Sequence, residues 1–236
     1  MLLPSIIFLC FILQHCIGEN SSQSDAVTTE IGKGVEAKVY ILYDTEDYAT
    51  KYTHHKHPKM SAVWYFIRLF ENVQSYFHRR NVKVLFSVIG VDLNKTVWVK
   101  TNHSIDTNAT LENLQKALPT GYIRPNKTIV YLFTNNTLPI TGSTDTATFG
   151  TFCTPNVSAA IVVQPPGNTS YTSTVKATSL IFGASGTVNF TRQDIDRMNK
   201  TFSNCKRKRR KTITTETTTE TTTPPTSVVM INTTMS

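Results

Sequence analysis

The chain has no histidine after position 103, although it contains 236 residues and six histidines in all. A zinc helix of the H-E-x-x-H type needs two imidazoles four residues apart, because zinc binds through the lone pairs of neutral nitrogen, thiolate or carboxylate. No alignment can place such a pair in the second half of the chain. This absence excludes a histidine-ligated protease centre there.

Cysteine is also scarce, with four residues in the whole chain. Cys10 and Cys16 lie within residues 1–18, whose short apolar run is typical of a secretory signal peptide that is removed. Cys153 and Cys205 would remain, and in an oxidising compartment they are expected to form one disulfide; two free thiols are the alternative. By loop-closure entropy this bond would stabilise the fold by about 3 to 4 kcal/mol.

Motifs for other catalytic chemistries are missing as well. A serine hydrolase needs a G-x-S-x-G elbow, and Gly183-Ala-Ser-Gly186 is one residue short of it. Cysteine nucleophiles are excluded if both remaining thiols are bonded. No phosphate-cradling or dinucleotide-binding glycine loop occurs either. No cofactor is therefore expected. Zinc would be bound only if the chain is an active protease with an unusual set of ligands.

The formal net charge of +8 is concentrated in one place. Six of these charges belong to residues 206–211, so the remaining domain is nearly balanced and a nucleic-acid-binding face is not expected. The run fits the pattern that secretory convertases cleave, and a solvated basic hinge able to bind heparan sulfate is the alternative. The residues of the processing pattern are Arg207, Lys208, Arg209 and Arg210.

Eleven N-x-S/T sequons occur in the chain. Sequons receive N-linked glycans in the secretory pathway, so this density behind a signal peptide predicts a secreted, extracellular glycoprotein. The sequon asparagines are Asn20, Asn94, Asn102, Asn108, Asn126, Asn135, Asn156, Asn168, Asn189, Asn199 and Asn232.

The C-terminal segment has a biased composition. Residues 212–226 contain ten threonines, two glutamates and a Pro-Pro pair, which together cannot bury enough apolar surface to fold. This predicts a disordered, mucin-like, O-glycosylated tail over residues 212–236. The apolar residues 227–231 are too few for a lipid-anchor signal or a membrane span, so release from the cell is expected.

Between a polar arm at residues 19–34 and Cys205, the hydrophobic period alternates between strand and helix patterns. The domain at residues 35–205 is therefore predicted to be α/β. Thr107 or Asn108 would cap its second helix. The expected strands are residues 35–43, 82–91, 128–133 and 157–163, and the expected helices are residues 58–78, 108–118 and 171–182.

Three short segments resemble, in their order, the reprolysin-like or adamalysin-type zinc metalloproteases. They are Ala-Thr-Phe-Gly-Thr-Phe-Cys at residues 147–153, Phe-Gly-Ala-Ser at residues 182–185 and Phe-Ser-Asn-Cys at residues 202–205. The resemblance implies a metzincin-like twisted mixed sheet with covering helices and a shortened C-terminal subdomain. It also implies an edge strand at residues 148–152, which receives substrate in active proteases, and it supports a disulfide between the two remaining cysteines.

The same resemblance assigns roles that the residues present cannot perform. When Gly183 is placed on the glycine of the family's zinc helix, Lys176 and Leu180 take the first two ligand positions. Ala177 then takes the position of the general base, and Gly186 that of the third ligand. An ammonium group repels a cation and a hydrocarbon has no lone pair to donate. The resemblance therefore implies a scaffold that has lost its metal.

One cluster could bind a metal independently of that helix. His54, His55 and His57 precede Pro58, and three imidazoles so close together could chelate copper or zinc. They lack the i, i+4 spacing of a helical site and have no neighbouring cysteine. A solvated loop at the start of a helix is the competing interpretation.

These observations predict a secreted glycoprotein with a degenerate metalloprotease-like domain, a pseudoenzyme that binds extracellular or host proteins without cleaving them. By resemblance, its relatives are the secreted salivary metalloproteases of blood-feeding ticks, which act on host matrix and clot proteins. Two alternatives stay open: an active secreted zinc metalloendopeptidase with an unconventional site, and a mucin-like coat glycoprotein. Neither a membrane span nor a nucleic acid partner is expected.

Overall fold

The structure of the protein, a computed structural model, describes residues 29–51, 58–101, 105–118, 125–136, 138, 147–186 and 188–205. The chain divides into two compact units, Met1–Lys206 and Arg207–Ser236, and every described residue belongs to the first. The predicted signal peptide, most of the polar arm, the basic run and the threonine-rich tail lie outside the described residues.

Helices and strands alternate along the described residues as the hydrophobic period predicts. Each strand and helix expected from the hydrophobic period is present, with its ends shifted by at most three residues, and two helices, α1 and α5, were not expected. No described helix has the length and apolar character needed to cross a bilayer. In chain order the elements are β1 (Glu36–Tyr43), α1 (Asp47–Thr50), α2 (Pro58–His78), β2 (Leu85–Leu93), α3 (Thr107–Lys116), the 3-10 turn η1 (Pro125–Lys127), β3 (Thr128–Thr134), β4 (Ser158–Val163), α4 (Thr172–Ile181) and α5 (Arg192–Cys205).

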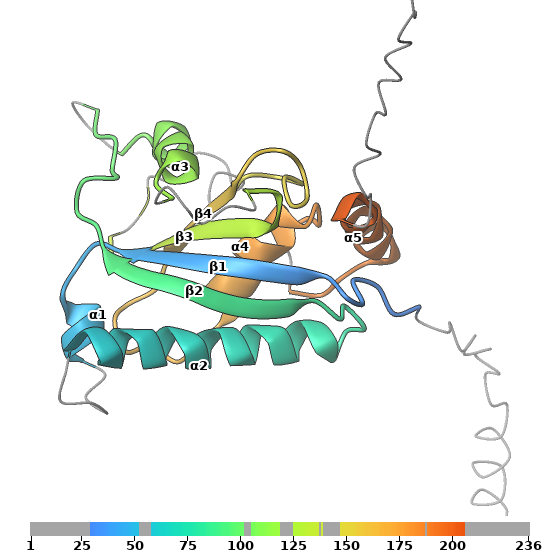
Figure 1. Cartoon of the computed structure of the whole chain (residues 1–236), viewed down its shortest axis with the longest axis horizontal. Coiled ribbons are helices and arrows are strands. Elements are labelled where there is room, and N and C mark those ends of the chain that lie inside the picture. The colour runs from blue at the N-terminus through green and yellow to red at the C-terminus, as the bar shows by residue number, and fades with distance from the viewer. Residues whose placement is uncertain are drawn as a thin grey trace, which may run out of the picture. The chain divides into compact units, whose positions relative to one another are not determined.

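The four strands form one parallel sheet in the order β2-β1-β3-β4 (Figure 1). The chain runs outward from β1 to the edge strand β2 and returns to the other side of β1, where Val39 of β1 pairs with Ile129 of β3. Strand order therefore reverses between β1 and β3. The resemblance implied a mixed sheet, with both parallel and antiparallel strands. In the described residues, antiparallel pairing with the sheet is confined to one isolated bridge to β4, between Ala147 and Ala160.

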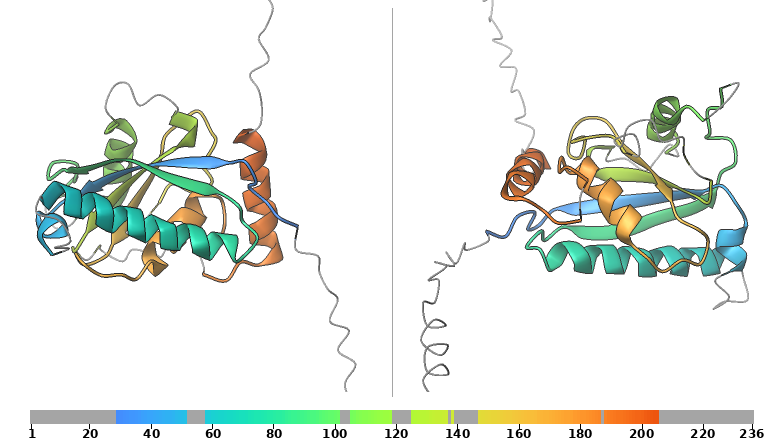
Figure 2. Two further views of the ribbon diagram at one scale, coloured as in Figure 1. Left: turned by 60° about the horizontal axis from the view of Figure 1, so that its bottom comes forward. Right: turned by 180° about the vertical axis from the view of Figure 1, so that it is seen from behind.

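Helices cover both faces of the sheet (Figures 1 and 2). On one face lie α2 and α4, and there Val39 and Ile41 of β1 share a core with Phe66 of α2. On the other face lies α3, and there Leu42 of β1 shares a second core with Leu114. Successive β1 residues thus face opposite cores, as the two-residue period of a strand requires. The predicted α/β class with covering helices is confirmed.

The start of α3 differs from the prediction. Its N-cap is Asp106, not Thr107 or Asn108, and Asp106 Oδ1 accepts a 2.9 Å hydrogen bond from the amide of Ala109. A carboxylate is a strong cap because it satisfies a free amide and interacts favourably with the positive end of the helix dipole. Thr107 and Asn108 can also cap helices, but here both lie in the first turn of α3, and the preceding Asp106 provides the cap.

Gly90 makes a close contact that only glycine allows. The register of β1 against β2 shifts between Val39 and Tyr40, and a Cβ on Gly90 would stand 2.3 Å from Tyr40 Cε2. A 2.7 Å hydrogen bond from the Tyr40 hydroxyl to Asp92 Oδ2 holds the ring in place. We expect Gly90→Ala to lower the free energy of unfolding in urea by about 1 to 3 kcal/mol through overpacking.

A second background isolates the cause of that loss. In a Tyr40→Leu variant the ring is absent, so Gly90→Ala should cost clearly less than in the natural protein. An equal cost in both backgrounds would show that the contact between ring and glycine is not what excludes a side chain.

Candidate functional site

The helix that the resemblance aligns with a zinc helix is α4, Thr172–Ile181. Lys176 is exposed on it, so its ammonium stays in water. Ala177 and Leu180 face inward, with 2% and 7% of their surface exposed, and both belong to the larger core. The predicted helix is therefore present, and two of the four positions assigned to chemistry serve packing instead.

Gly186 and Leu180 lie in direct contact. A Cβ on Gly186 would stand 3.0 Å from both Leu180 Cγ and Leu180 Cδ2, and the backbone of Gly186 has a φ of +77°, which favours glycine. The second and third ligand positions of the resemblance are thus adjacent in space. What fills the space between them is an isobutyl group, which has no electron pair for a metal.

Two buried polar side chains of α4, Thr178 and Ser179, donate hydrogen bonds within the helix. Thr178 Oγ1 donates to the Thr174 carbonyl at 2.6 Å and Ser179 Oγ donates to the Val175 carbonyl at 2.7 Å. The Tyr131 hydroxyl lies 2.8 Å from Thr178 Oγ1, and burial raises the pKa of this phenol far above its usual range. These internal bonds explain how a helix rich in threonine and serine is stable inside a core.

The predicted edge strand at residues 148–152 is wrong. Backbone pairing with β4 is limited to the bridge at Ala147 and a 2.9 Å bond from the Thr148 amide to the Ala159 carbonyl. At Gly150, where φ is +64°, the chain turns away from the sheet, and the Gly150 amide donates to the Leu180 carbonyl at 2.9 Å. The segment therefore caps the C-terminal end of α4. The Gly150 amide is therefore not free to donate to a substrate backbone.

No group of three or more histidine, cysteine, aspartate or glutamate side chains that could hold a metal occurs among the described residues. His54, His55 and His57 lie outside these residues. His78 is described, and its Nε2 lies 2.9 Å from the Val84 carbonyl, which ties the end of α2 to the start of β2.

Helix α5 and its buried Asp194 were missed by sequence reasoning. Asp194 is only 1% exposed, and it accepts hydrogen bonds from the Ser185 amide at 2.9 Å, the Thr191 amide at 3.0 Å and the Thr191 hydroxyl at 2.8 Å. The Asp194 amide donates back to Thr191 Oγ1 at 3.2 Å. This reciprocal pair is a capping box, and the Thr-x-x-Asp spacing at residues 191–194 was a sequence signal for it.

These hydrogen bonds stabilise the ionised form of the Asp194 side chain. Burial alone would raise the pKa of its carboxyl, but the hydrogen bonds from Thr191 and Ser185 outweigh burial and hold the pKa below its usual range. Asp194 therefore joins the loop after α4 to the start of α5 as a carboxylate, and its role is structural.

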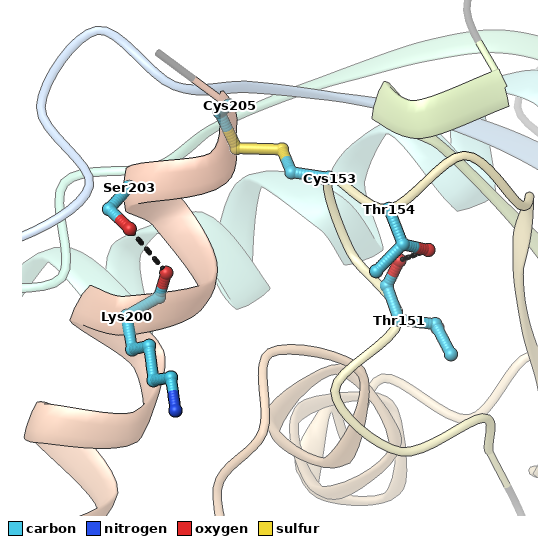
Figure 3. Close-up of a disulfide and its surroundings, with 6 residues drawn as sticks. All are labelled: Thr151, Cys153, Thr154, Lys200, Ser203 and Cys205. Atoms are coloured by element: carbon cyan, nitrogen blue, oxygen red, sulfur yellow. Dashed lines mark hydrogen bonds between the residues drawn. A yellow bond between two sulfur atoms is a disulfide. The ribbon is translucent and has the colours of Figure 1, made fainter. Parts of the chain in front are cut away.

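The disulfide joins Cys153 to Cys205, as the sequence predicts, with the two Cα atoms 5.0 Å apart. Figure 3 shows it between the last turn of α5 and the loop that carries Thr151 and Thr154. On the inner side of α5, Met198 is fully buried in the core. The bond and this packing together hold α5 on the domain.

Polar groups at the carboxyl end of the sheet form a cluster around Asp44. Its Oδ2 accepts hydrogen bonds from Trp98 Nε1 at 3.2 Å, Thr134 Oγ1 at 2.6 Å and Asn136 Nδ2 at 3.0 Å. The cluster lies where strand order reverses, the usual place of a ligand site in a parallel sheet. Here the carboxylate is used to hold three loops together.

Eight of the eleven sequon asparagines lie among the described residues, and six of these are exposed. Asn94 and Asn126 are half-buried, while Asn20, Asn102 and Asn232 lie outside the described residues. The side chain of Asn94 accepts hydrogen bonds from Thr96 and Val97 through Oδ1, the atom to which no glycan is attached. The exposed members are Asn108, Asn135, Asn156, Asn168, Asn189 and Asn199.

Comparison with known proteins adds little to this geometry. No protein-family model matches the chain, and no curated protein matches it. Among solved structures the chain is similar to metalloproteinase II from Bacteroides fragilis, with 12% sequence identity, a TM-score of 0.40, and coverage of 73% of this chain and 55% of that chain. The chain thus spans little more than half the length of that structure.

A likeness of this degree carries no argument about family, substrate or chemistry. The resemblance to reprolysin-like proteases, and to those of tick saliva, stays an expectation from the sequence. The chemistry of the site is argued from its own residues.

Proposed function

We propose that this chain is a secreted glycoprotein whose metalloprotease-like domain binds extracellular proteins and does not cleave them. One observation carries the proposal. The positions that the resemblance assigns to zinc ligands hold an exposed ammonium, a buried isobutyl group and a glycine, and Leu180 packs directly on Gly186.

The chemistry of such a site explains why this matters. Zinc proteases use the ion to lower the pKa of a bound water, and a carboxylate then removes its proton. Lys176 cannot hold the ion, and Ala177 has no group that accepts a proton. Without metal and base, neither the nucleophile nor the stabilisation of the developing oxyanion is supplied.

The sequons support the same proposal from another direction. Asn156 stands two residues before β4, Asn168 lies shortly before α4, and Asn189 follows it, and all three are exposed. Glycans on them would crowd the surroundings of α4, the helix that the resemblance aligns with a zinc helix. A binding protein shielded from recognition would tolerate that arrangement, and its partners, by resemblance, would be host matrix and clot proteins.

The test uses the full-length, glycosylated chain. Isothermal titration with zinc should show no stoichiometric binding, and incubation with gelatin or fibrinogen should show no cleavage that a chelator abolishes. Stoichiometric zinc binding together with chelator-sensitive proteolysis would overturn the proposal.

A matched variant separates α4 from the histidine cluster. If zinc binds the natural chain without proteolysis, the His54→Ala/His55→Ala/His57→Ala variant should lose that binding, because three neighbouring imidazoles are the remaining candidate ligands. Zinc bound equally well by this variant would show that the histidine cluster does not hold the metal.

A further inference from the structure

Strand β2 lies at one edge of the sheet and pairs only with β1 (Figure 1). Of its nine residues only Val91 is buried, and Leu85 and Leu93 at its two ends expose 50% and 39% of their surface. An edge strand presents a row of amides and carbonyls that can pair with a strand of another chain. The sheet could therefore extend beyond one molecule at β2.

The sequence of β2 favours such pairing. It reads Leu-Phe-Ser-Val-Ile-Gly-Val-Asp-Leu, with one charged side chain, Asp92, and no proline or lysine. Segments of high β propensity and low charge are typical of strands that associate edge to edge. Prolines and lysines, which prevent this association at the edges of many sheets, are absent from this strand.

Hydrogen bonds show which backbone groups of β2 point outward. The Leu85 amide donates to the Val35 carbonyl at 3.0 Å, so it points towards β1. Along a strand in a parallel sheet, the amide and carbonyl of successive residues point alternately to either side. The backbone groups of Val84, Phe86 and Val88 therefore point away from the sheet.

Two side chains of α2 bind the outward groups at the amino half of this edge. Gln74 Oε1 accepts a 2.8 Å hydrogen bond from the Phe86 amide. His78 Nε2 lies 2.9 Å from the Val84 carbonyl, and because a carbonyl only accepts, this nitrogen is the donor. Gln74 and His78 are one helical turn apart on the same side of α2. Together they take the place of a neighbouring strand along this half of β2.

This protection ends at Val88. In the part of the chain that the structure describes, no group accepts a hydrogen bond from the Val88 amide. One and two turns before Gln74, the same side of α2 carries Phe70 and Ile67, whose side chains have no polar atom. Beyond Val88 comes the shift in register against β1, an irregularity that disturbs pairing along the strand.

The opposite edge of the sheet is closed by the segment that precedes β4. Thr148 Oγ1 accepts a 3.0 Å hydrogen bond from the Ala159 amide of β4, and Ala147 forms a bridge with Ala160. A side chain thus takes up an outward amide at this edge too. Strand β2 is the longer and more exposed of the two edge strands.

We propose that Gln74 and His78 form an edge cap, which prevents β2 from pairing with the β2 strand of a second copy of this chain. Two identical strands can pair about a two-fold axis, because each copy then supplies the groups that the other lacks. The edge cap occupies the Phe86 amide and the Val84 carbonyl, so this half of the edge offers no free partner. The proposal is independent of catalysis and of the protein partners proposed above.

The test measures self-association of the full-length chain by sedimentation over a range of concentrations. Gln74→Leu removes the acceptor and keeps a side chain of similar size. This variant should form dimers at concentrations at least about tenfold lower than the natural chain does, because one Phe86 amide from each copy then lacks a partner.

Two matched variants separate the edge cap from other causes. Gln74→Glu keeps an acceptor for the Phe86 amide, so it should associate no more than the natural chain. Gln193→Leu adds the same apolar side chain at an exposed position of α5, and it should not associate either. Circular dichroism and thermal melting establish that each variant is folded.

Amide hydrogen exchange resolved to single residues tests the edge cap without association. In the natural chain at low concentration, the Phe86 amide should exchange at least about tenfold more slowly than the Val88 amide, which has no acceptor. In Gln74→Leu the Phe86 amide should exchange as fast as that of Val88.

Three outcomes would overturn the proposal. They are a folded Gln74→Leu variant that associates no more than the natural chain, equal association of Gln193→Leu, and equal exchange of the Phe86 and Val88 amides in the natural chain. The last measurement needs no variant, so it decides the question even if Gln74→Leu does not fold.

Discussion

Replacing Asp194 with alanine is expected to lower the free energy of unfolding by about 2 to 4 kcal/mol. The substitution leaves the amides of Ser185 and Thr191 without the acceptor of two partly buried hydrogen bonds and removes the capping box of α5. Because α5 supplies Met198 and Phe202 to the core, loss of its first turn also weakens that packing. Urea denaturation followed by circular dichroism measures the effect.

Asp196→Asn is the matched control, since Asp196 is an exposed carboxylate on the same helix. It should change the free energy of unfolding by less than about 0.5 kcal/mol. If Asp194→Ala and Asp196→Asn lower the free energy of unfolding by the same amount, the loss would come from the charge of the helix and not from the hydrogen bonds of Asp194.

The pH dependence follows from the lowered pKa of Asp194. A carboxyl whose pKa is lower in the folded state stabilises the fold above the unfolded-state pKa of about 3.9, and that stabilisation is lost as the pH falls through the folded-state value. The difference in free energy of unfolding between the natural chain and Asp194→Asn should therefore be constant from neutral pH down to about pH 5 and shrink below about pH 4. A difference that grows on acidification would contradict this.

Removing the disulfide with Cys153→Ala/Cys205→Ala is expected to cost about 3 to 4 kcal/mol. The bond joins residues 52 apart, and the closed loop contains β4, α4 and α5. Cross-linking so long a loop restricts the unfolded chain, so its loss favours unfolding. Thermal melting of the two proteins under oxidising conditions measures the difference.

Reductant provides the control. It should lower the melting temperature of the natural chain towards that of the double variant and leave the variant unchanged. A reductant effect of similar size on both proteins would show that the loss does not come from this bond.

Much of the fold could be predicted because its signals are local. The three- and four-residue repeat of apolar side chains gave α2 the bounds Pro58–His78, and the apolar run at β3 matches a strand in which every residue is buried. In both cases the pattern is carried by residues that are close together in sequence. Each element needs only an apolar surface to pack against, so the identity of its partners does not affect the prediction.

Other parts could not be predicted, because distant groups decide them. The resemblance implied a strand at residues 148–152, but the Gly150 amide finds its acceptor at the end of α4. Helix α5 is rich in polar and charged residues, and it is held by a buried capping box, by Phe202 against Gly32 and by the disulfide. The capping box is local, since Thr191 and Asp194 lie at the start of α5, but Gly32 and Cys153 lie far from α5 in sequence.

By itself the sequence determined which atoms are present: it has no histidine beyond position 103 and no group at Lys176, Ala177, Leu180 or Gly186 that could complete a zinc site. Only the tertiary structure decided that Leu180 packs on Gly186, and that Phe202 of α5 packs on Gly32 before β1. The physical reason is that residue type sets which interactions are possible, whereas packing of distant segments sets which of them are made.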